Sequence, residues 1–187
     1  MRKPVYHHPN FVIKTEAKRT KTKRYWLKLI IDENKKESIV VILKNPSRAT
    51  KDISDKTVFN VTNYIYKNRM RFKSLNNIGT IIILNLIPNY ETYSEKLSLM
   101  PTSIIDKKNL ETIKDFALET KNIIIAWGNP PKGLVKEYNI IKENVLNVLR
   151  ENNNNIYYIH KLSALGNPKH GQIWAYANEM IKYDLNN

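Results

Sequence analysis

Five short apolar runs, each stopped by a charged, polar or turn residue, constrain the fold of this chain most strongly. They are rich in Ile, Val and aromatic residues, and they are separated by longer polar segments. The runs cover residues 24–31, 39–43, 79–86, 122–127 and 156–159. Short apolar runs of this kind are typical of buried strands, and strands buried on both faces belong to parallel sheets. The sequence therefore predicts a central sheet.

Amphipathic segments alternate with these runs and predict the helices between the strands. Asp55 and Asp106 are well placed to cap helices, because an aspartate before an apolar repeat is a helix-start signal. Further helices are expected at 134–150 and 173–183. Alternating strands and helices predict an α/β three-layer sandwich, with a mainly parallel sheet and helices on both faces. We expect a single domain at 24–187.

Composition narrows the classes of protein to consider. The chain has 187 residues and no cysteine, which excludes disulfides, thiolate metal sites and a cysteine nucleophile. No apolar stretch reaches the roughly 20 residues that span a bilayer, and the first residues lack the apolar core of a signal peptide. We expect a cytoplasmic protein without membrane, metal or cofactor. The pair His7 and His8 has no nearby acidic partner and is not interpreted as a metal site.

A formal net charge of +14 favours polyanionic partners. Nucleic acid, DNA rather than RNA, or a nucleotide is the expected partner; solubility or a lysine-rich coding bias is the alternative explanation. Residues 1–23 form an expected basic arm, either in contact with phosphates or simply solvated. The candidate phosphate contacts are Lys18, Arg19, Lys21, Lys23, Arg69, Arg71, Lys73 and Lys169.

Polar and turn residues follow four of the predicted strands. If these strands are parallel, their exit loops meet at one edge of the sheet, where ligands bind in open α/β folds. The exits read Asn45-Pro46-Ser47, Asn85, Trp127-Gly128, and Gly166 to His170.

The same motifs resemble an uncharacterised bacterial and phage family, a domain of unknown function. The resemblance runs from Arg24 to about Trp174 and brings no established activity. The residues that carry it are Arg24-Tyr25-Leu27, Asn45-Pro46-Ser47-Ala49, Asp55 with Thr57, Asn85-Leu86, Ala126-Trp127-Gly128, and Gly166-Pro168-His170.

More distantly, the order of motifs resembles the uracil-DNA glycosylase superfamily. That resemblance implies a uracil-DNA glycosylase-like fold. It also implies that Asn45 and Pro46 position a hydrolytic water and that Asn85 reads a base edge. Trp127-Gly128 would match a strand end, and Asn167-Pro168 or His170 the final loop. The sequence departs from the pattern at Leu43-Lys44, at Ser47 and in the last loop.

These considerations give a set of candidate site residues. The catalytic candidates are Asn45, Asp52 and His170. The substrate-binding candidates are Pro46, Ser47, Asn85, Tyr90, Trp127, Gly128, Asn167 and Pro168. Asp52 and Asp55 are alternative general bases or metal ligands, although Asp52 also suits a surface charge and Asp55 a helix cap.

Three functions remain open at this point. The first is a glycosylase-like hydrolase that cleaves an N-glycosidic bond in DNA or in a nucleotide. The second is a non-catalytic module that binds DNA or a nucleotide, or inhibits a nucleic-acid enzyme. The third is a small-molecule hydrolase or transferase that uses Asp52, Asp55 and His170.

Overall fold

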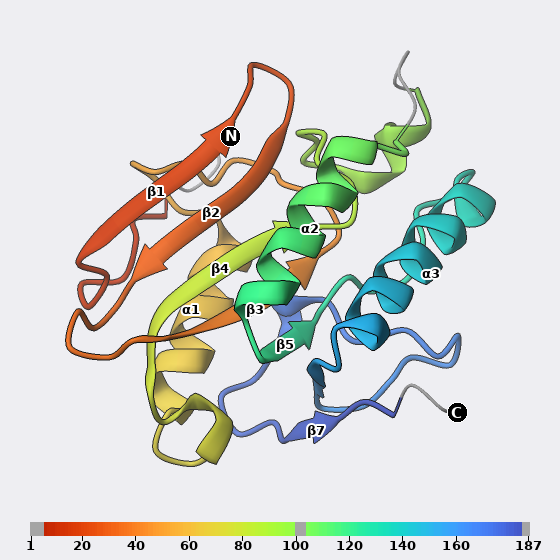
Figure 1. Cartoon of the computed structure of the whole chain (residues 1–187). Helices are drawn as coiled ribbons and strands as arrows, with labels where there is room; N and C mark the ends of the chain where they lie inside the picture. The colour runs from red at the N-terminus through yellow and green to blue at the C-terminus, as the bar shows by residue number, and fades with distance from the viewer. Residues whose placement is uncertain (1–5, 100–103, 185–187) are drawn as a thin grey trace.

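A mixed seven-stranded sheet forms the centre of the molecule in the computed structural model, which describes residues 6–99 and 104–184 (Figure 1). The strand order is β1-β2-β4-β3-β5-β6-β7. The strands are β1 (Lys14–Arg19), β2 (Arg24–Ile30), β3 (Glu37–Leu43), β4 (Ile78–Asn85), β5 (Asn122–Ile125), β6 (Asn155–Ile159) and β7 (Met180–Lys182). The α-helices are α1 (Lys56–Asn68), α2 (Lys107–Glu119) and α3 (Val135–Glu151). Short 3-10 turns lie at Lys73–Leu75, Ser94–Leu99 and Gly171–Ile173.

The α/β class is confirmed, but the expectation of a mainly parallel sheet is wrong. Only the four inner strands, β4, β3, β5 and β6, run parallel to one another. The three outer strands, β1, β2 and β7, join the sheet antiparallel. Parallel neighbours need a long crossover between them, whereas β1 and β2 are linked by a tight turn that only an antiparallel pair accepts. The apolar runs correctly marked the inner strands.

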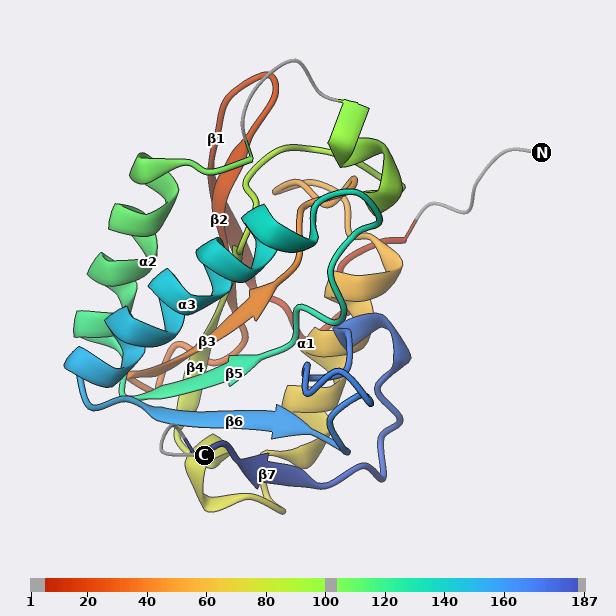
Figure 2. The same cartoon turned by 90° about the vertical axis from the view of Figure 1, so that its right-hand side faces the viewer.

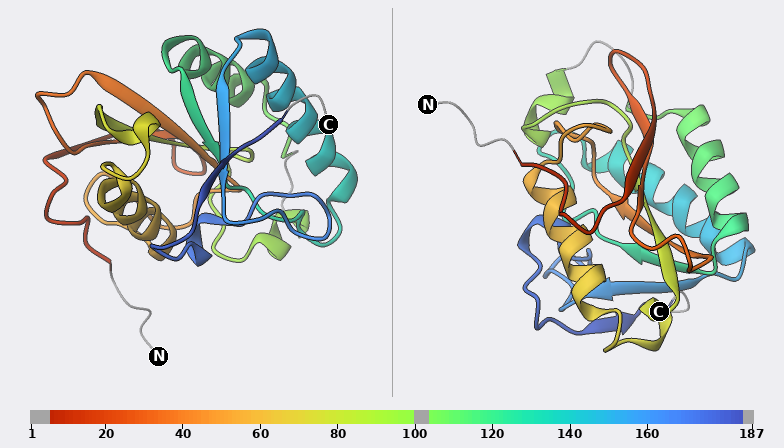
Figure 3. Two further views of the ribbon diagram at one scale, coloured as in Figure 1. Left: turned by 90° about the horizontal axis from the view of Figure 1, so that it is seen from below. Right: turned by 90° about the vertical axis from the view of Figure 1, so that its left-hand side faces the viewer.

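Helices cover both faces of the sheet, as the sequence predicts. Helix α1 lies on one face, and α2 and α3 lie together on the other (Figure 2 and Figure 3, right). Alternate residues of each strand point to opposite faces, so β3 sends Val40 to the core under α2 and α3 and Val41 to the core under α1. The sheet is thus buried on both sides at its centre, which explains its continuous apolar runs.

The predicted helix starts at Asp55 and Asp106 are confirmed. The Asp55 carboxylate accepts a hydrogen bond from the backbone N–H of Val58, at the third position of α1. Asp106 does the same for Asn109 in α2. Each cap satisfies a backbone donor that has no partner within the helix, and its negative charge faces the positive end of the helix dipole.

The expected terminal helix at 173–183 is wrong. The chain there runs in an extended path along α1 and then forms β7, which pairs with β6. Three side chains spaced four residues apart on α1 bind this path: Asn60 donates to the carbonyls of residues 171, 172 and 174, Tyr64 to that of 178, and Asn68 to that of 176. These bonds occupy carbonyls that a helix would use internally, which explains why helical spacing was misleading here.

The expected basic arm at 1–23 is partly an element of the sheet. Lys14 to Arg19 form β1 at the sheet edge, paired with β2. Its charged side chains suit an edge strand, because charge discourages pairing with another chain. Residues 1–5 lie outside the described residues. Among the described residues, no helix is long and apolar enough to cross a membrane.

The topology brings the ends of the inner strands together where the chain reverses direction across the sheet. From β3 the chain crosses to β4 on one side and then returns to β5 on the other. Leu43, at the end of β3, lies opposite Asn85, at the end of β4. Ligands in open α/β sheets bind at the carboxyl ends of strands beside such a switch point.

Candidate functional site

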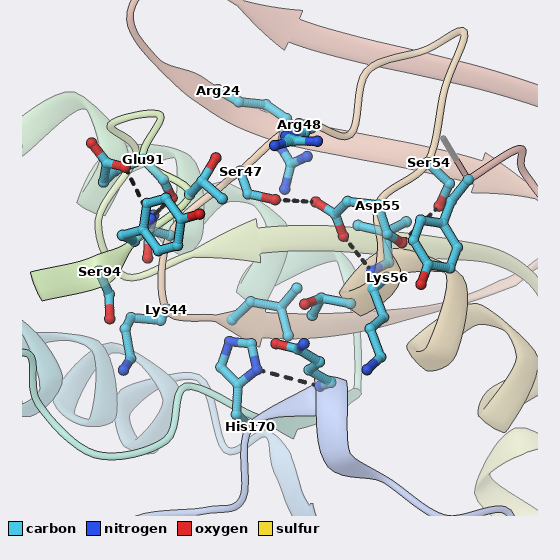
Figure 4. A pocket seen from close by; sticks show the side chains of 18 of the residues that line it. Arg24, Lys44, Ser47, Arg48, Ser54, Asp55, Lys56, Glu91, Ser94 and His170 are labelled. Carbon is cyan, nitrogen blue, oxygen red and sulfur yellow. Dashed lines mark hydrogen bonds between the residues drawn. The ribbon is translucent and has the colours of Figure 1, made fainter. Parts of the chain in front are cut away.

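A cavity of about 670 Å³ opens at the carboxyl end of β3, beside this switch point (Figure 4). Its volume lies in the range of small-molecule sites. The walls come from the loop after β3, the start of α1, the loop after β4 and the turn at His170. The lining residues used below are Arg24, Lys44, Asn45, Ser47, Arg48, Asp55, Lys56, Thr57, Glu91 and His170.

Asp55 organises the loop that forms one wall. One carboxylate oxygen caps α1 through Val58, and the other accepts from the Ser47 hydroxyl at 2.8 Å and from the Ala49 N–H at 3.3 Å. The residue thus fixes the loop relative to the helix start. Because the protein already donates to both oxygens, Asp55 acts first as a structural acceptor.

Arg24 is the buried cation of the site. Its side chain is 1% exposed, and it donates from Nη1 to the Ala49 carbonyl at 2.9 Å and from Nη2 to Asn85 Oδ1 at 3.0 Å. Burial lowers the pKa of the guanidinium, and the charge of Asp55 opposes that shift. Both hydrogen-bond partners are neutral, so the charge of Arg24 is held in place without a carboxylate bonded to it within the described part of the chain.

His170 faces the cavity as a neutral imidazole. Burial and the positive charge of Lys44 lower its pKa to about 4. Its Nδ1 accepts from the Gln172 N–H at 3.3 Å, which leaves Nε2 as the protonated nitrogen (Figure 4). The ring packs against Gly128, whose φ of 69° and missing side chain permit this approach. His170 therefore presents an N–H donor at neutral pH.

Asn45 joins the two loops beside the cavity. Its Nδ2 donates to the Glu91 carbonyl at 2.6 Å and to the Pro46 carbonyl at 3.1 Å. The amide orientation is fixed by these two bonds, because only the nitrogen can donate. The Oδ1 is then the acceptor of this side chain and can hold a water or a ligand N–H.

The charges around the cavity are unequal. Four cationic side chains line it, against the two carboxylates of Asp55 and Glu91. With His170 neutral, the formal surplus is two positive charges. The first turn of α1 adds the partial positive charge of a helix N-terminus. The cavity is thus suited to an anion.

Several predicted residues lie behind the cavity wall. Asn85 is fully buried, and its Oδ1 accepts a hydrogen bond from Arg24, so it positions that side chain beside the cavity. Asn45 and Asn85 do meet at one edge of the sheet, but Asn85 is not a lining residue. The other predicted substrate contacts outside the lining are Pro46, Tyr90, Trp127, Gly128, Asn167 and Pro168.

The buried aromatic candidate has a core role. Trp127 is 1% exposed and belongs to the core under α2 and α3. Asn167 is also buried and bonds to Asn129 and to the Leu165 carbonyl, which shapes the loop that precedes His170. These two side chains position loops around the cavity.

The structure separates other predicted residues from the cavity. Asp52 is exposed and does not line it. Arg69, Arg71 and Lys73 follow the end of α1, about 20 Å along the 13-residue helix from its start. Arg71 forms an ion pair with Glu179. This group therefore lies near the opposite ends of the parallel strands, away from the cavity.

The other predicted phosphate contacts lie nearer. Lys18, Arg19, Lys21 and Lys23 lie around the β1–β2 turn, which meets the loop after β4 through hydrogen bonds from Tyr90 to Thr22 and from Arg24 to Pro88. Lys23 is engaged in an ion pair of 2.7 Å with Asp106. Lys169 precedes His170.

Sequence reasoning missed the cations that make the cavity basic. Arg24, Lys44, Arg48 and Lys56 were not among the predicted site residues, yet all four line it. One signal was present in the sequence, since Arg24 opens a strand that is otherwise apolar except for Lys28. Among the described residues, no group of three or more His, Asp or Glu side chains could hold a metal ion.

A family model described as "Protein of unknown function (DUF1643)" matches residues 24–171. The chain belongs to this family. No match was found among curated proteins or among solved structures. The DUF1643 region begins at Arg24 and ends one residue after His170, so it contains all the lining residues of the cavity except Tyr6 and Gln172.

Proposed function

We propose that this DUF1643 protein binds a nucleotide unit of DNA, or a free nucleotide, in the cavity and hydrolyses its N-glycosidic bond. The observation that carries the proposal is the presence of Asn45, His170 and four cations in one cavity at the switch point of the sheet. The cations suit phosphate, and the two polar side chains suit the chemistry at the base and at the sugar.

The proposed reaction uses each side chain in a simple role. The Oδ1 of Asn45 holds a water, which attacks C1′ of the sugar while the bond from C1′ to the base nitrogen breaks. The base leaves with the bonding electron pair, and a proton of the water passes to solvent. The neutral Nε2–H of His170 donates to an oxygen of the departing base and stabilises its negative charge. The reaction needs no change in the protonation of either side chain.

A direct experiment follows. The protein is incubated with oligonucleotides that contain uracil, a mismatched base or a modified base, and with free nucleotides, and abasic sites or released bases are measured. We expect release of a base, and a loss of about 10²-fold or more in rate for Asn45→Ala and for His170→Ala. The matched control is Asn63→Ala, a partly exposed asparagine on α1 outside the cavity, which should retain full activity.

The second candidate is a binding module without turnover. The engagement of both Asp55 oxygens favours it, because the carboxylate closest to the helix start is not free to act as a general base. In that case the same incubations give no product from any substrate, and a separate binding measurement on the same ligands gives tight, salt-sensitive binding. The third candidate, a hydrolase that uses Asp52, has less support because Asp52 does not line the cavity.

A further inference from the structure

We propose that the cavity selects a phosphomonoester: a nucleotide with a terminal phosphate, either free or at the end of a strand, in preference to an internal phosphodiester. This inference rests on the proposed function, because it names the substrate class of the same cavity. It makes a separate claim about binding, which can hold or fail whether or not a bond is cleaved.

The buried guanidinium is the first argument. Removing a cation from water is costly unless an opposite charge compensates it. Arg24 is 1% exposed, and its two bonded partners are a backbone carbonyl and a neutral amide. Within the described residues its Nε has no hydrogen-bond partner. The charge of Asp55 acts on the guanidinium without a hydrogen bond between them, and a bound anion would supply a directly bonded opposite charge.

The start of α1 is the second argument. Lys56 and Thr57 open this 13-residue helix and line the cavity. Backbone N–H groups in the first turn have no carbonyl partner within the helix, so they are available to anion oxygens. The Asp55 side chain accepts from the N–H of Val58, the third residue of the helix, and not from those of Lys56 and Thr57. Arg48 and Lys56 are exposed and line the cavity together with the buried Arg24.

The number of charges is the third argument and distinguishes the two kinds of phosphate. The lining holds four cations and two carboxylates, which leaves a surplus of two positive charges. A phosphomonoester carries about −1.5 to −2 at pH 7, whereas each internal phosphate of a strand carries one negative charge. His170 stays neutral and does not enter this balance. The doubly charged end group therefore matches the cavity better.

Binding measurements by titration calorimetry test the inference. Deoxyuridine is compared with deoxyuridine 5′-monophosphate, and one oligonucleotide is compared with its 5′-phosphorylated form. We expect each phosphorylated ligand to bind at least tenfold more tightly than its partner. Arg48→Gln should weaken binding of the monophosphate about tenfold. The control Lys114→Gln removes another exposed positive charge, on α2 and outside the cavity, and should leave the affinity unchanged.

The two ligand pairs distinguish the source of the phosphate. A preference confined to the mononucleotide identifies a free nucleotide, and a preference in both pairs identifies the end of a strand. Equal affinity within both pairs, or an Arg48→Gln variant that binds like the parent, overturns the inference. Phosphate-dependent binding without base release contradicts only the proposed reaction. Base release at internal positions without a phosphate preference contradicts only the selection of the end group.

Discussion

At the scale of single residues, the site depends on side chains held in unusual electrostatic states. Arg24 keeps its charge in a buried position, and His170 stays neutral beside a lysine. The buried charge of Arg24 carries a desolvation cost, whereas the depressed pKa of His170 lowers stability only below about pH 6.5. Both states suit the proposed ligand, because the first attracts an anion and the second offers a donor without adding charge. Perturbed titratable groups in a cavity are a recognised mark of functional sites.

The pH dependence of stability tests the state of His170. The folded pKa of about 4 lies below the ordinary value of 6.5, so the unfolded chain binds a proton more readily than the folded one between these values. Stability should therefore fall as pH falls from about 6.5 to 4, by up to about 3 kcal/mol. Urea unfolding at pH 4.5 and 7.5 measures this loss, and His170→Gln should reduce it. An imidazole that titrates near 6.5 by NMR in the folded protein would contradict the account.

At the scale of elements, the cavity depends on how α1 begins and on what packs along it. Asp55 ties the loop after β3 to the helix start, and Asn60, Tyr64 and Asn68 tie the extended C-terminal path to the helix side. The two attachments place the loop and His170 on either side of the same helix start (Figure 4). Helix α1 thus aligns the two halves of the site.

The two aspartate caps offer a matched pair of variants. Asp55→Ala and Asp106→Ala each remove a cap, and each should cost about 1–2 kcal/mol of unfolding free energy. Only Asp55 also holds Ser47 and Ala49 at the cavity. We therefore expect Asp55→Ala to weaken nucleotide binding at least tenfold and Asp106→Ala to leave it within about twofold. Equal effects of the two variants on binding would show that the loop does not need Asp55.

Gly171 tests the attachment of the His170 turn. A methyl group there would lie 2.5 Å from Val61 Cγ2, so Gly171→Ala should push the turn away from α1 and cost about 1–3 kcal/mol. Adding Val61→Ala restores space and should recover much of the lost binding, although it introduces a small cavity of its own. The double variant is compared with both single variants by urea unfolding and calorimetry. Failure of the second change to improve binding would contradict the proposed contact.

The sequence predicted the inner strands and the helix starts better than it predicted the edge strands β1 and β7. Apolar runs and aspartate caps identified the inner strands and the starts of α1 and α2, because burial and capping leave local signals. Strand β1 carries a charged, partly exposed sequence, and β7 has only three residues, so neither has an apolar run to reveal it. The extended path before β7 depends on side chains of α1 more than 100 positions away.

The candidate site was predictable in part for the same reason. Asn45, Ser47 and His170 follow strand ends or turns, and fold rules bring such loops together. Asn85 and Trp127 also follow or end strands, but burial directs their side chains into the wall and the core. The direction of a side chain at a strand end depends on local register, which a single sequence does not give.

At the scale of the whole molecule, positive side chains lie near both ends of the parallel strands. The β1–β2 turn with Lys18, Arg19 and Lys21 lies beside the carboxyl ends of the parallel strands, as the cavity does. Arg69 and Lys73 follow the far end of α1. A ligand in the cavity that continues as a strand would pass the first group. If the proposed ligand is a strand, only part of the net charge of +14 would take part in its specific binding.

Salt dependence separates the two groups. Each phosphate contact contributes about −0.7 to the slope of log K against log salt for single-stranded DNA. The variant Lys18→Gln/Lys21→Gln should make the slope shallower by about 1.4, and Arg69→Gln/Lys73→Gln should leave it unchanged. Affinities are measured by fluorescence anisotropy between about 50 and 300 mM salt, a range over which the Debye length shortens and exposed charges become increasingly screened. A reversed pattern would place the strand at the far end of α1.

A crystal structure of the protein with deoxyuridine 5′-monophosphate tests the central claim most directly, because the claim concerns one cavity with one ligand. The account predicts the phosphate at the start of α1, within reach of Arg48 and Lys56, and the base within hydrogen-bond distance of His170 Nε2. A nucleotide bound at another surface, with no density for it in the cavity, would contradict the account.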